Sequence, residues 1–283
     1  MQHRIINRSI QLAGYALAGA SVLGVIAAVS FAGIRQGQPL LPFAGSRNTG
    51  LQPAAVQPYV HQDASDKSAN PAVYTPDSKP YGLSYEDWST FWWQRVLFIP
   101  PDDNPNLDTS GADCAQGQSG PVWYLAGTFG GSAKRTCFIT TGVSVLIPIL
   151  TTAFGAGLGD CLSPGWGNAG PCDVNALRAA AAAQEDNPQR LELSLDGIPL
   201  SGLNAYRVQP PPFSYAVTSA NILGQLFGFP VPAGIYQPAV TDGYWVMFKP
   251  LSPGQHTIHA KGVQSDGFAV ETTYSLIVQG GAH

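Results

Sequence analysis

The stretch "PLSPGQHTIHAKGVQSDGFAVETTYSLIVQ", residues 250–279, carries the clearest folding signal of the chain. In each half of it, apolar and polar side chains alternate, which is typical of a β-strand with one buried and one exposed face. Ser265-Asp266-Gly267 separates the two halves and supplies the glycine that a tight turn favours. We therefore predict two antiparallel strands joined by a hairpin.

The same two-residue period is found earlier in the chain. Leucines alternate with polar residues over 191–195, Asp196-Gly197 supplies the next turn, and residues 243–248 are typical of an aromatic strand. The sequence also contains 32 Gly and 24 Pro, a composition that favours a turn-rich β protein. We predict a mainly β fold, a disulfide-linked antiparallel β-sandwich of immunoglobulin-like or jelly-roll-like type, with immunoglobulin-like strands over residues 190–280.

Two helices are expected to accompany the strands. In "GLSYEDWSTFWWQRVLFIP", residues 82–100, Ser84 is a suitable N-cap, Asp87 occupies the capping-box position, and the helix should end before Pro100. A second, short and Ala-rich helix should begin at Asp173, whose side chain can cap it. We expect the first, Trp-rich helix to pack on the sandwich.

The tryptophans of the first helix are predicted to have different environments. Trp88 and Trp92 lie one turn apart in an apolar stripe, so we expect both rings in the core. Trp93 projects about a third of a turn away, beside Glu86, a side chain that favours solvent. We therefore predict that Trp93 lies at the edge of a groove, where it can contact a ligand.

The N-terminus predicts export. Arg4 and Arg8 precede an apolar run that continues to Arg35. Two alternatives remain open: a secretory signal cleaved after Ala32, or an uncleaved helix over residues 10–34 that anchors the chain in the membrane. Because positive flanks stay on the cytoplasmic side, both alternatives place the rest of the chain in the periplasm, on the cell surface or in the medium.

Composition divides the chain into three parts. Residues 1–35 are the signal peptide or membrane anchor, residues 36–79 are predicted to be a flexible tether, and residues 80–283 are predicted to form one β-rich globular domain. Charged residues make up only 11% of the sequence and the formal net charge is −4. With no cluster of Lys and Arg, the sequence argues against a nucleic-acid partner.

The four cysteines are predicted to form disulfides. Cys114, Cys137, Cys161 and Cys172 all lie in the exported part, and four cysteines allow three pairings. We favour Cys114–Cys137 and Cys161–Cys172 because these pairings close the shortest loops. The four cysteines lack the CxxC-like spacing that would indicate a zinc site.

No complete catalytic or metal-binding constellation is evident. His256 and His259 lie three residues apart in an expected strand, so they should point to opposite faces and cannot share a metal ion. We predict no metal and no cofactor. Asp108 and Asp242 are the pair that would serve a hydrolase if the fold brought them together, although Asp108 is better explained as the start of an Asx-turn.

Four longer stretches of the chain carry a family resemblance. The resemblance is to exported bacterial proteins with a GLSY-x-x-W-x-x-x-WWQ helix and an immunoglobulin-like C-terminal hairpin, and no activity is assigned to that family. It covers most of residues 80–280, so it implies export and a fold but no function. The stretches are GLSYEDWSTFWWQ (82–94), LDTSGADCAQGQSGPVWYLAGTFGG (107–131), RTCFITTGVSVLIPIL (135–150) and DGYWVMFKPLSPGQHTIHAKG (242–262).

A binding surface is the functional hypothesis that these features favour. Flat rings beside amide side chains suit the capture of a sugar, a peptide or a wall component. The predicted ligand-binding residues are Trp93, Gln94, Trp166 and Tyr244. We expect a non-enzymatic cell-envelope protein with a carbohydrate or protein partner, or a surface-structural module. The alternatives are a cell-envelope hydrolase with an acidic site and a subunit of an envelope assembly.

Overall fold

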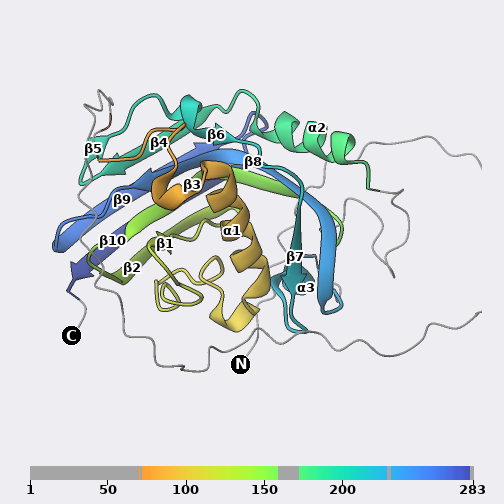
Figure 1. The fold of residues 1–283 in the computed structure, drawn as a ribbon, viewed down its shortest axis with the longest axis horizontal. Coiled ribbons are helices and arrows are strands. Elements are labelled where there is room, and N and C mark those ends of the chain that lie inside the picture. The colour runs from red at the N-terminus through yellow and green to blue at the C-terminus, as the bar shows by residue number, and fades with distance from the viewer. Residues whose placement is uncertain (1–69, 71, 159–171, 228–230, 281–283) are drawn as a thin grey trace, which may run out of the picture. The chain divides into compact units, whose positions relative to one another are not determined.

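The protein is described from a computed structural model, which covers residues 70, 72–158, 172–227 and 231–280. These residues form ten strands in two sheets together with three α-helices (Figure 1). The helices are α1 (Tyr85–Phe98), α2 (Val174–Glu185) and α3 (Ile222–Phe227). The strands are β1 (Val122–Tyr124), β2 (Gly131–Thr140), β3 (Ser144–Gly155), β4 (Arg190–Leu195), β5 (Ile198–Pro199), β6 (Arg207–Val208), β7 (Phe213–Val217), β8 (Gly234–Phe248), β9 (Gly254–Val263) and β10 (Ala269–Gln279).

The two sheets are both mixed. Sheet A has the strand order β1-β3-β8-β6, with β7 also paired to β8, and sheet B has the order β2-β10-β9-β4-β5. This arrangement confirms a mainly β, sandwich-like fold. The expected antiparallel pairing holds for most strands, but β1 pairs with β3 and β2 pairs with β10 in parallel, so both sheets are mixed. The predicted hairpin is present as β9 and β10. The two strands pair antiparallel, with Gly254 opposite Val278 at one end and Val263 opposite Ala269 at the other.

Sheet A is the middle layer of the fold. Ser144–Leu150 of β3 and residues 239–248 of β8 are buried without alternation, as expected for strands that are covered on both faces. On one face lies α1 (Figure 1). The Trp92 ring of α1 packs edge-to-face on Trp245 of β8 at a centroid distance of 5.2 Å. On the other face lies sheet B, where Gly262 of β9 directly faces β3.

Local sequence signals explain where the helices and turns begin. The Ser84 hydroxyl accepts a hydrogen bond from the Asp87 amide, and the Asp87 carboxylate accepts one from the Ser84 amide at 2.9 Å, so the predicted capping box is present. Asp173 caps α2 as predicted. Asp196 has a positive φ of 52° between β4 and β5, in the turn that the Asp-Gly pair predicts.

The globular domain begins before the predicted boundary at residue 80. Val73 is completely buried and bridges to Phe248 of β8, and the Tyr74 amide donates to the Met247 carbonyl at 3.0 Å. The last residues of the predicted tether therefore belong to the fold, while residues 36–69 lie outside the described residues. In the described ranges, no helix has the length and apolar character needed to cross a membrane.

One predicted disulfide is confirmed. Cys114, in the loop that follows α1, is bonded to Cys137 in β2. The disulfide ties this loop to the edge of sheet B, where the Thr136 amide also donates to the Ser110 carbonyl. The predicted Cys161–Cys172 pairing depends on Cys161, which lies outside the described residues.

Candidate functional site

The tryptophans of α1 are all buried. Trp88 and Trp92 lie in the core, as predicted. The predicted exposure of Trp93 is wrong, because its side chain is only 7% exposed and its indole N–H donates to the Thr151 hydroxyl at 3.3 Å. The physical reason is that α1 contacts β6, β7 and β8, so sheet A covers a wider arc of the helix than one stripe. The exposed ring on this part of α1 is Phe91.

The other three predicted ligand-binding residues differ in where the fold places them. Tyr244 is buried in β8, where its hydroxyl donates to the Glu185 carbonyl at 2.9 Å, so it is not at a binding surface. Trp166 lies outside the described residues. Gln94 lines a pocket, and its side-chain amide donates to the Ser214 carbonyl at 2.7 Å. Of the three predicted residues that the structure describes, Gln94 is therefore the one at a candidate site.

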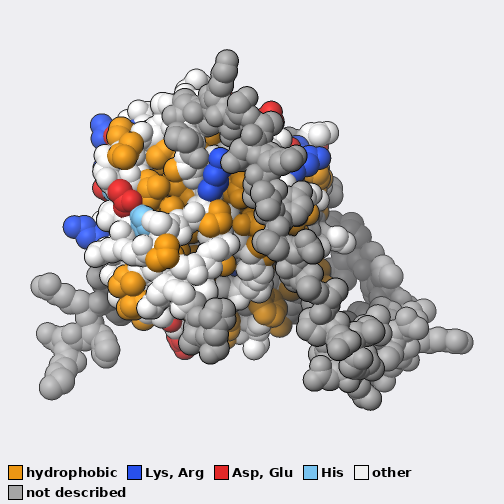
Figure 2. All heavy atoms as spheres, turned by 60° about the vertical axis from the view of Figure 1, so that its left-hand side comes forward, with side chains coloured by type: hydrophobic (Ala, Val, Ile, Leu, Met, Phe, Trp, Pro, Cys, Tyr) orange, Lys and Arg blue, Asp and Glu red, His pale blue; other side chains and the backbone are white. Residues whose placement is uncertain are grey.

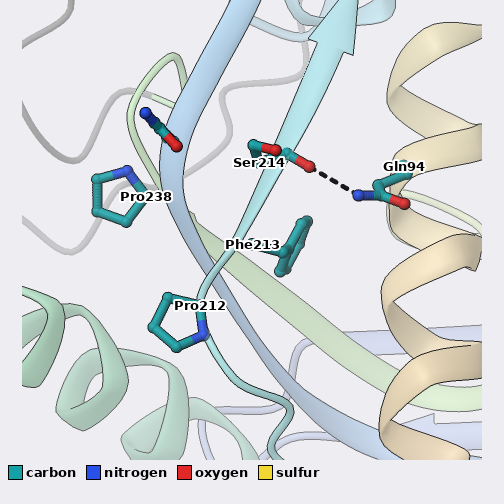
Figure 3. A pocket seen from close by; sticks show the side chains of 6 residues that line it. Gln94, Pro212, Phe213, Ser214 and Pro238 are labelled. Atoms are coloured by element: carbon teal, nitrogen blue, oxygen red, sulfur yellow. Dashed lines mark hydrogen bonds between the residues drawn. The ribbon is translucent and has the colours of Figure 1, made fainter.

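The pocket lies between α1 and the paired strands β7 and β8, and its volume is about 680 Å³. Figure 3 shows Gln94 facing β7 across the pocket, with the dashed hydrogen bond to Ser214. The lining residues are Gln94, Pro212, Phe213, Ser214, Gln237 and Pro238.

An irregular strand pairing shapes the wall of this pocket. Phe213 pairs with Ala239 and Tyr215 pairs with Tyr236, so Ser214 alone lies opposite Gln237 and Pro238. Such a bulge bends the strand and redirects its side chains, and bulges of this kind are common beside binding sites. Pro238 also carries no backbone N–H, so it cannot donate to the ladder at this point.

The chemistry of the pocket is neutral. None of the lining side chains is ionisable, so they cannot serve as general acids or bases near neutral pH. The two glutamine amides and the Ser214 hydroxyl can both donate and accept hydrogen bonds, and Phe213 supplies a ring. This combination suits recognition of an uncharged ligand that carries hydroxyl or amide groups.

Two exposed rings flank Gln94 on the surface of α1. Phe91 precedes Gln94 by three residues and Phe98 follows it by four, spacings that make side chains neighbours on a helix. Their side chains are 41% and 53% exposed. Each ring leaves apolar area in water that contact with a ligand would remove. The pocket and the two rings together form the candidate binding face.

The acidic pair considered for a hydrolase is committed to other partners. The Asp108 carboxylate accepts hydrogen bonds within its own loop, from the amides of Ser110, Gly111 and Asp113. Partial burial opposes ionisation, but these bonds outweigh it and lower the pKa of Asp108. The predicted Asx-turn is thus present.

Asp242 has a different set of partners. Its side chain is buried in β8 and forms a two-pronged ion pair with Arg207, with both N···O distances at 2.8 Å, while the Gln209 amide also donates to it. This geometry holds the carboxylate in a structural network. The contacts of Asp108 and Asp242 share no residue, so the structure gives the acidic-site hypothesis no support.

A buried carboxyl lies next to this network. Glu185 ends α2, and its Oε1 accepts a hydrogen bond from the Gln264 amide at 3.0 Å. The other oxygen, Oε2, is buried without a partner among the described residues. Burial, reinforced by the nearby Asp242 carboxylate, raises the pKa of Glu185 to about 8, although Gln264 and Arg207 act in the opposite direction.

The two histidines have separate partners. His256 Nδ1 lies 2.8 Å from Asp196 Oδ2, and His259 Nε2 lies 2.9 Å from Glu271 Oε1. In the part of the chain that the structure describes, no group of three or more His, Cys, Asp or Glu side chains is arranged to hold a metal ion. No protein-family model, curated protein or solved structure matches the chain.

Proposed function

We propose that this is an exported cell-envelope protein that binds a neutral saccharide in the pocket between α1 and β7, without catalysing a reaction there. The observation that carries the proposal is the composition of the pocket wall: two amides, a hydroxyl, a ring and two prolines, with no ionisable side chain. Its volume of about 680 Å³ lies within the range of small-molecule sites.

A saccharide is the neutral ligand that fits this face best. Each hydroxyl of a sugar both donates and accepts hydrogen bonds, which matches the amides of Gln94 and Gln237. The apolar faces of a pyranose ring can pack on the exposed rings of Phe91 and Phe98, and that contact removes their apolar surface from water. On the side of the molecule that lies at the left of Figure 1, Figure 2 shows scattered Lys, Arg, Asp and Glu side chains among hydrophobic ones, and charged residues make up only 11% of the whole chain.

Export is supported by two features. The Cys114–Cys137 disulfide is typical of oxidising compartments outside the cytoplasm. The basic N-terminus followed by an apolar run has the composition of a signal peptide or an anchor over residues 10–34. We further propose that the chain belongs to the exported bacterial family described above and that its last strands are immunoglobulin-like. If the N-terminal segment is not cleaved, it contacts the membrane as an anchor.

The test of the proposal is calorimetric titration of the full chain with neutral disaccharides, namely maltose, cellobiose and N,N′-diacetylchitobiose. We expect at least one of them to bind, and Gln94→Ala to weaken its binding at least fivefold. Gln189→Ala is the matched control, because Gln189 also donates its side-chain amide to a serine carbonyl, that of Ser265, at 2.9 Å. Equal affinity for the two variants, or no heat with any disaccharide, would contradict the proposal.

A subunit of an envelope assembly is a second candidate. The observation that favours it is the exposure of apolar side chains on both edge strands of sheet B, where Phe138 of β2 is 61% exposed and Ile198 of β5 is 70% exposed. Edge strands that carry exposed apolar residues are prone to pair with other chains. Light scattering that finds a monomer across micromolar concentrations would remove this candidate.

A further inference from the structure

Two turns at one end of sheet B bring a serine, a histidine and an aspartate together. Asp196 lies in the turn between β4 and β5, Ser252 lies in the segment just before β9, and His256 lies in the first residues of β9. The turns meet because β4 pairs with β9, with Leu195 opposite Ile258. This cluster is separate from the α1–β7 pocket, since none of its residues lines that pocket.

The three side chains form a continuous hydrogen-bonded line. Ser252 Oγ lies 3.2 Å from His256 Nε2, and His256 Nδ1 lies 2.8 Å from Asp196 Oδ2. The second oxygen of Asp196 accepts the Thr257 amide at 2.7 Å, which fixes the carboxylate on the strand. A nucleophile within reach of a base that a third group orients is the arrangement that activates a serine.

The protonation pattern follows from the partners. Partial burial opposes ionisation of Asp196, but the bonds from Thr257 and His256 outweigh it and lower the pKa of Asp196. An ionised carboxylate only accepts hydrogen bonds, so Nδ1 of His256 must carry the proton. In a neutral ring Nε2 then carries no proton, and of its two neighbours the Ser252 hydroxyl at 3.2 Å can donate to it, while the Ser252 carbonyl oxygen at 3.0 Å cannot.

We propose that Ser252 and His256 hydrolyse small activated esters, with Asp196 as the positioning residue. Oγ attacks the ester carbonyl carbon while its proton passes to Nε2. The bond to the alkoxy group then breaks, and the leaving alcohol takes that proton. Water attacks the acyl group on Ser252, giving its proton to His256, and the carboxylic acid leaves as Oγ regains the proton.

A second acceptor supports the charged form of the histidine. Nε2 also lies 3.0 Å from the Ser252 carbonyl oxygen. Once the ring has taken the serine proton, its Nε2–H has this acceptor while Nδ1–H keeps Asp196. The imidazolium that forms in the transition state is therefore bonded at both ends, which lowers the barrier for proton transfer.

The setting of the cluster indicates the class of substrate. Ser252 is exposed, and the His256 and Asp196 side chains are 14% and 43% exposed. An open turn gives access to a substrate but grips little of it, so selection depends on the reactivity of the ester and not on its shape. Short-chain esters with a good leaving group are therefore the expected substrates.

The experiment uses the full chain, an alkyl fluorophosphonate probe and p-nitrophenyl acetate. The serine should displace fluoride from the probe, and peptide mass spectrometry should find the adduct on Ser252. Ser252→Ala should remove the adduct and lower ester hydrolysis at least tenfold. Ser265→Ala, which changes another exposed serine on a turn, is the control and should leave both readouts unchanged.

Two further variants separate this proposal from simpler explanations. Asp196→Asn should lower kcat at least tenfold with KM unchanged, a split that a merely structural aspartate would not produce. If His256→Ala abolishes hydrolysis while Ser252→Ala retains it, the imidazole acts alone and the proposal fails. Absence of an adduct on Ser252 in the folded wild-type chain would also overturn it, and that outcome depends on no variant.

Discussion

At the end of α2, the Glu185 carboxyl lies in an environment that differs strongly from that of a free side chain. It is completely buried, one oxygen has no partner among the described residues, and Asp242 lies close enough to oppose its charge. An ionised carboxylate there would be desolvated and repelled, so the folded protein favours the protonated form. The contacts of Glu185 hold the end of α2 against β8 and Gln264.

This residue should make stability depend on pH. Its pKa is about 8 in the fold against an ordinary 4.5, so between these values the folded state holds a proton that the unfolded state has lost. Stability should therefore fall as pH rises from 4.5 to 8, by up to about 1.4 kcal/mol per pH unit from this group. Glu185→Gln cannot titrate, so its stability relative to the wild type should rise over that interval in urea unfolding.

The control for this prediction is Glu192→Gln, which changes an exposed glutamate on β4. Its stability relative to the wild type should stay nearly constant over the same pH interval. A constant difference for Glu185→Gln as well would show that the Glu185 carboxyl ionises normally in the fold.

At the scale of the element, α1 has little free surface. Trp92 and Trp93 pack edge-to-face with centroids 5.2 Å apart, and each indole N–H has an acceptor, the Leu125 carbonyl for Trp92 and the Thr151 hydroxyl for Trp93. The helix is thus held on sheet A by rings that point in two directions, while Phe91 and Phe98 are exposed on either side of Gln94 at the pocket.

Truncation of rings on α1 should separate the two faces. Trp93→Ala should lower the free energy of unfolding by about 3–5 kcal/mol, because it removes a large buried ring and its hydrogen bond to the Thr151 hydroxyl. Phe91→Ala should cost less than about 1 kcal/mol, since the Phe91 ring is partly in water. Denaturant unfolding midpoints measure both, and an equal loss in the two variants would show that the faces are assigned wrongly.

The beginnings of the elements could be predicted from the sequence because their signals are local. Ser84 with Asp87, Asp173, and the Asp-Gly turn at 196 act over one to three residues. The parallel pairing of β2 with β10 could not be predicted, because it joins strands more than a hundred residues apart. Gln94 could be predicted as a binding residue because its amide lies beside aromatic rings in the sequence. Ser214 and Gln237, on the opposite wall of the pocket, could not, because their position depends on a register shift that no local pattern encodes.

At the scale of the whole molecule, sheet A is enclosed between α1 and sheet B. The two sheets approach closely at Gly262, where an added Cβ would lie 2.7 Å from the Ile149 carbonyl oxygen and from Leu150 Cβ. Real Cβ atoms do not come so close to backbone, so the glycine sets the spacing between the layers. The pocket depends on the same arrangement, because β7 is a strand of sheet A and α1 packs on that sheet.

Gly262→Ala should therefore push the sheets apart and lower stability by about 1–3 kcal/mol, the usual cost of overpacking a core. Thermal or urea unfolding measures the loss. Gly234→Ala is the control, because the nearest atom to its added Cβ would be a Tyr236 side-chain carbon at 3.8 Å, an ordinary contact. If the two variants are equally stable, the layers are less tightly packed than described.

The binding role of the α1–β7 face is tested most directly by a ¹H–¹⁵N NMR titration of the labelled full chain with maltose, cellobiose and N,N′-diacetylchitobiose. We predict saturable shifts of the Ser214 and Gln237 backbone amides and of the Gln94 side-chain amide with at least one disaccharide. The amide of Thr273, on sheet B, should not move. Unchanged pocket amides at millimolar concentrations of all three sugars, or shifts confined to sheet B, would contradict the account.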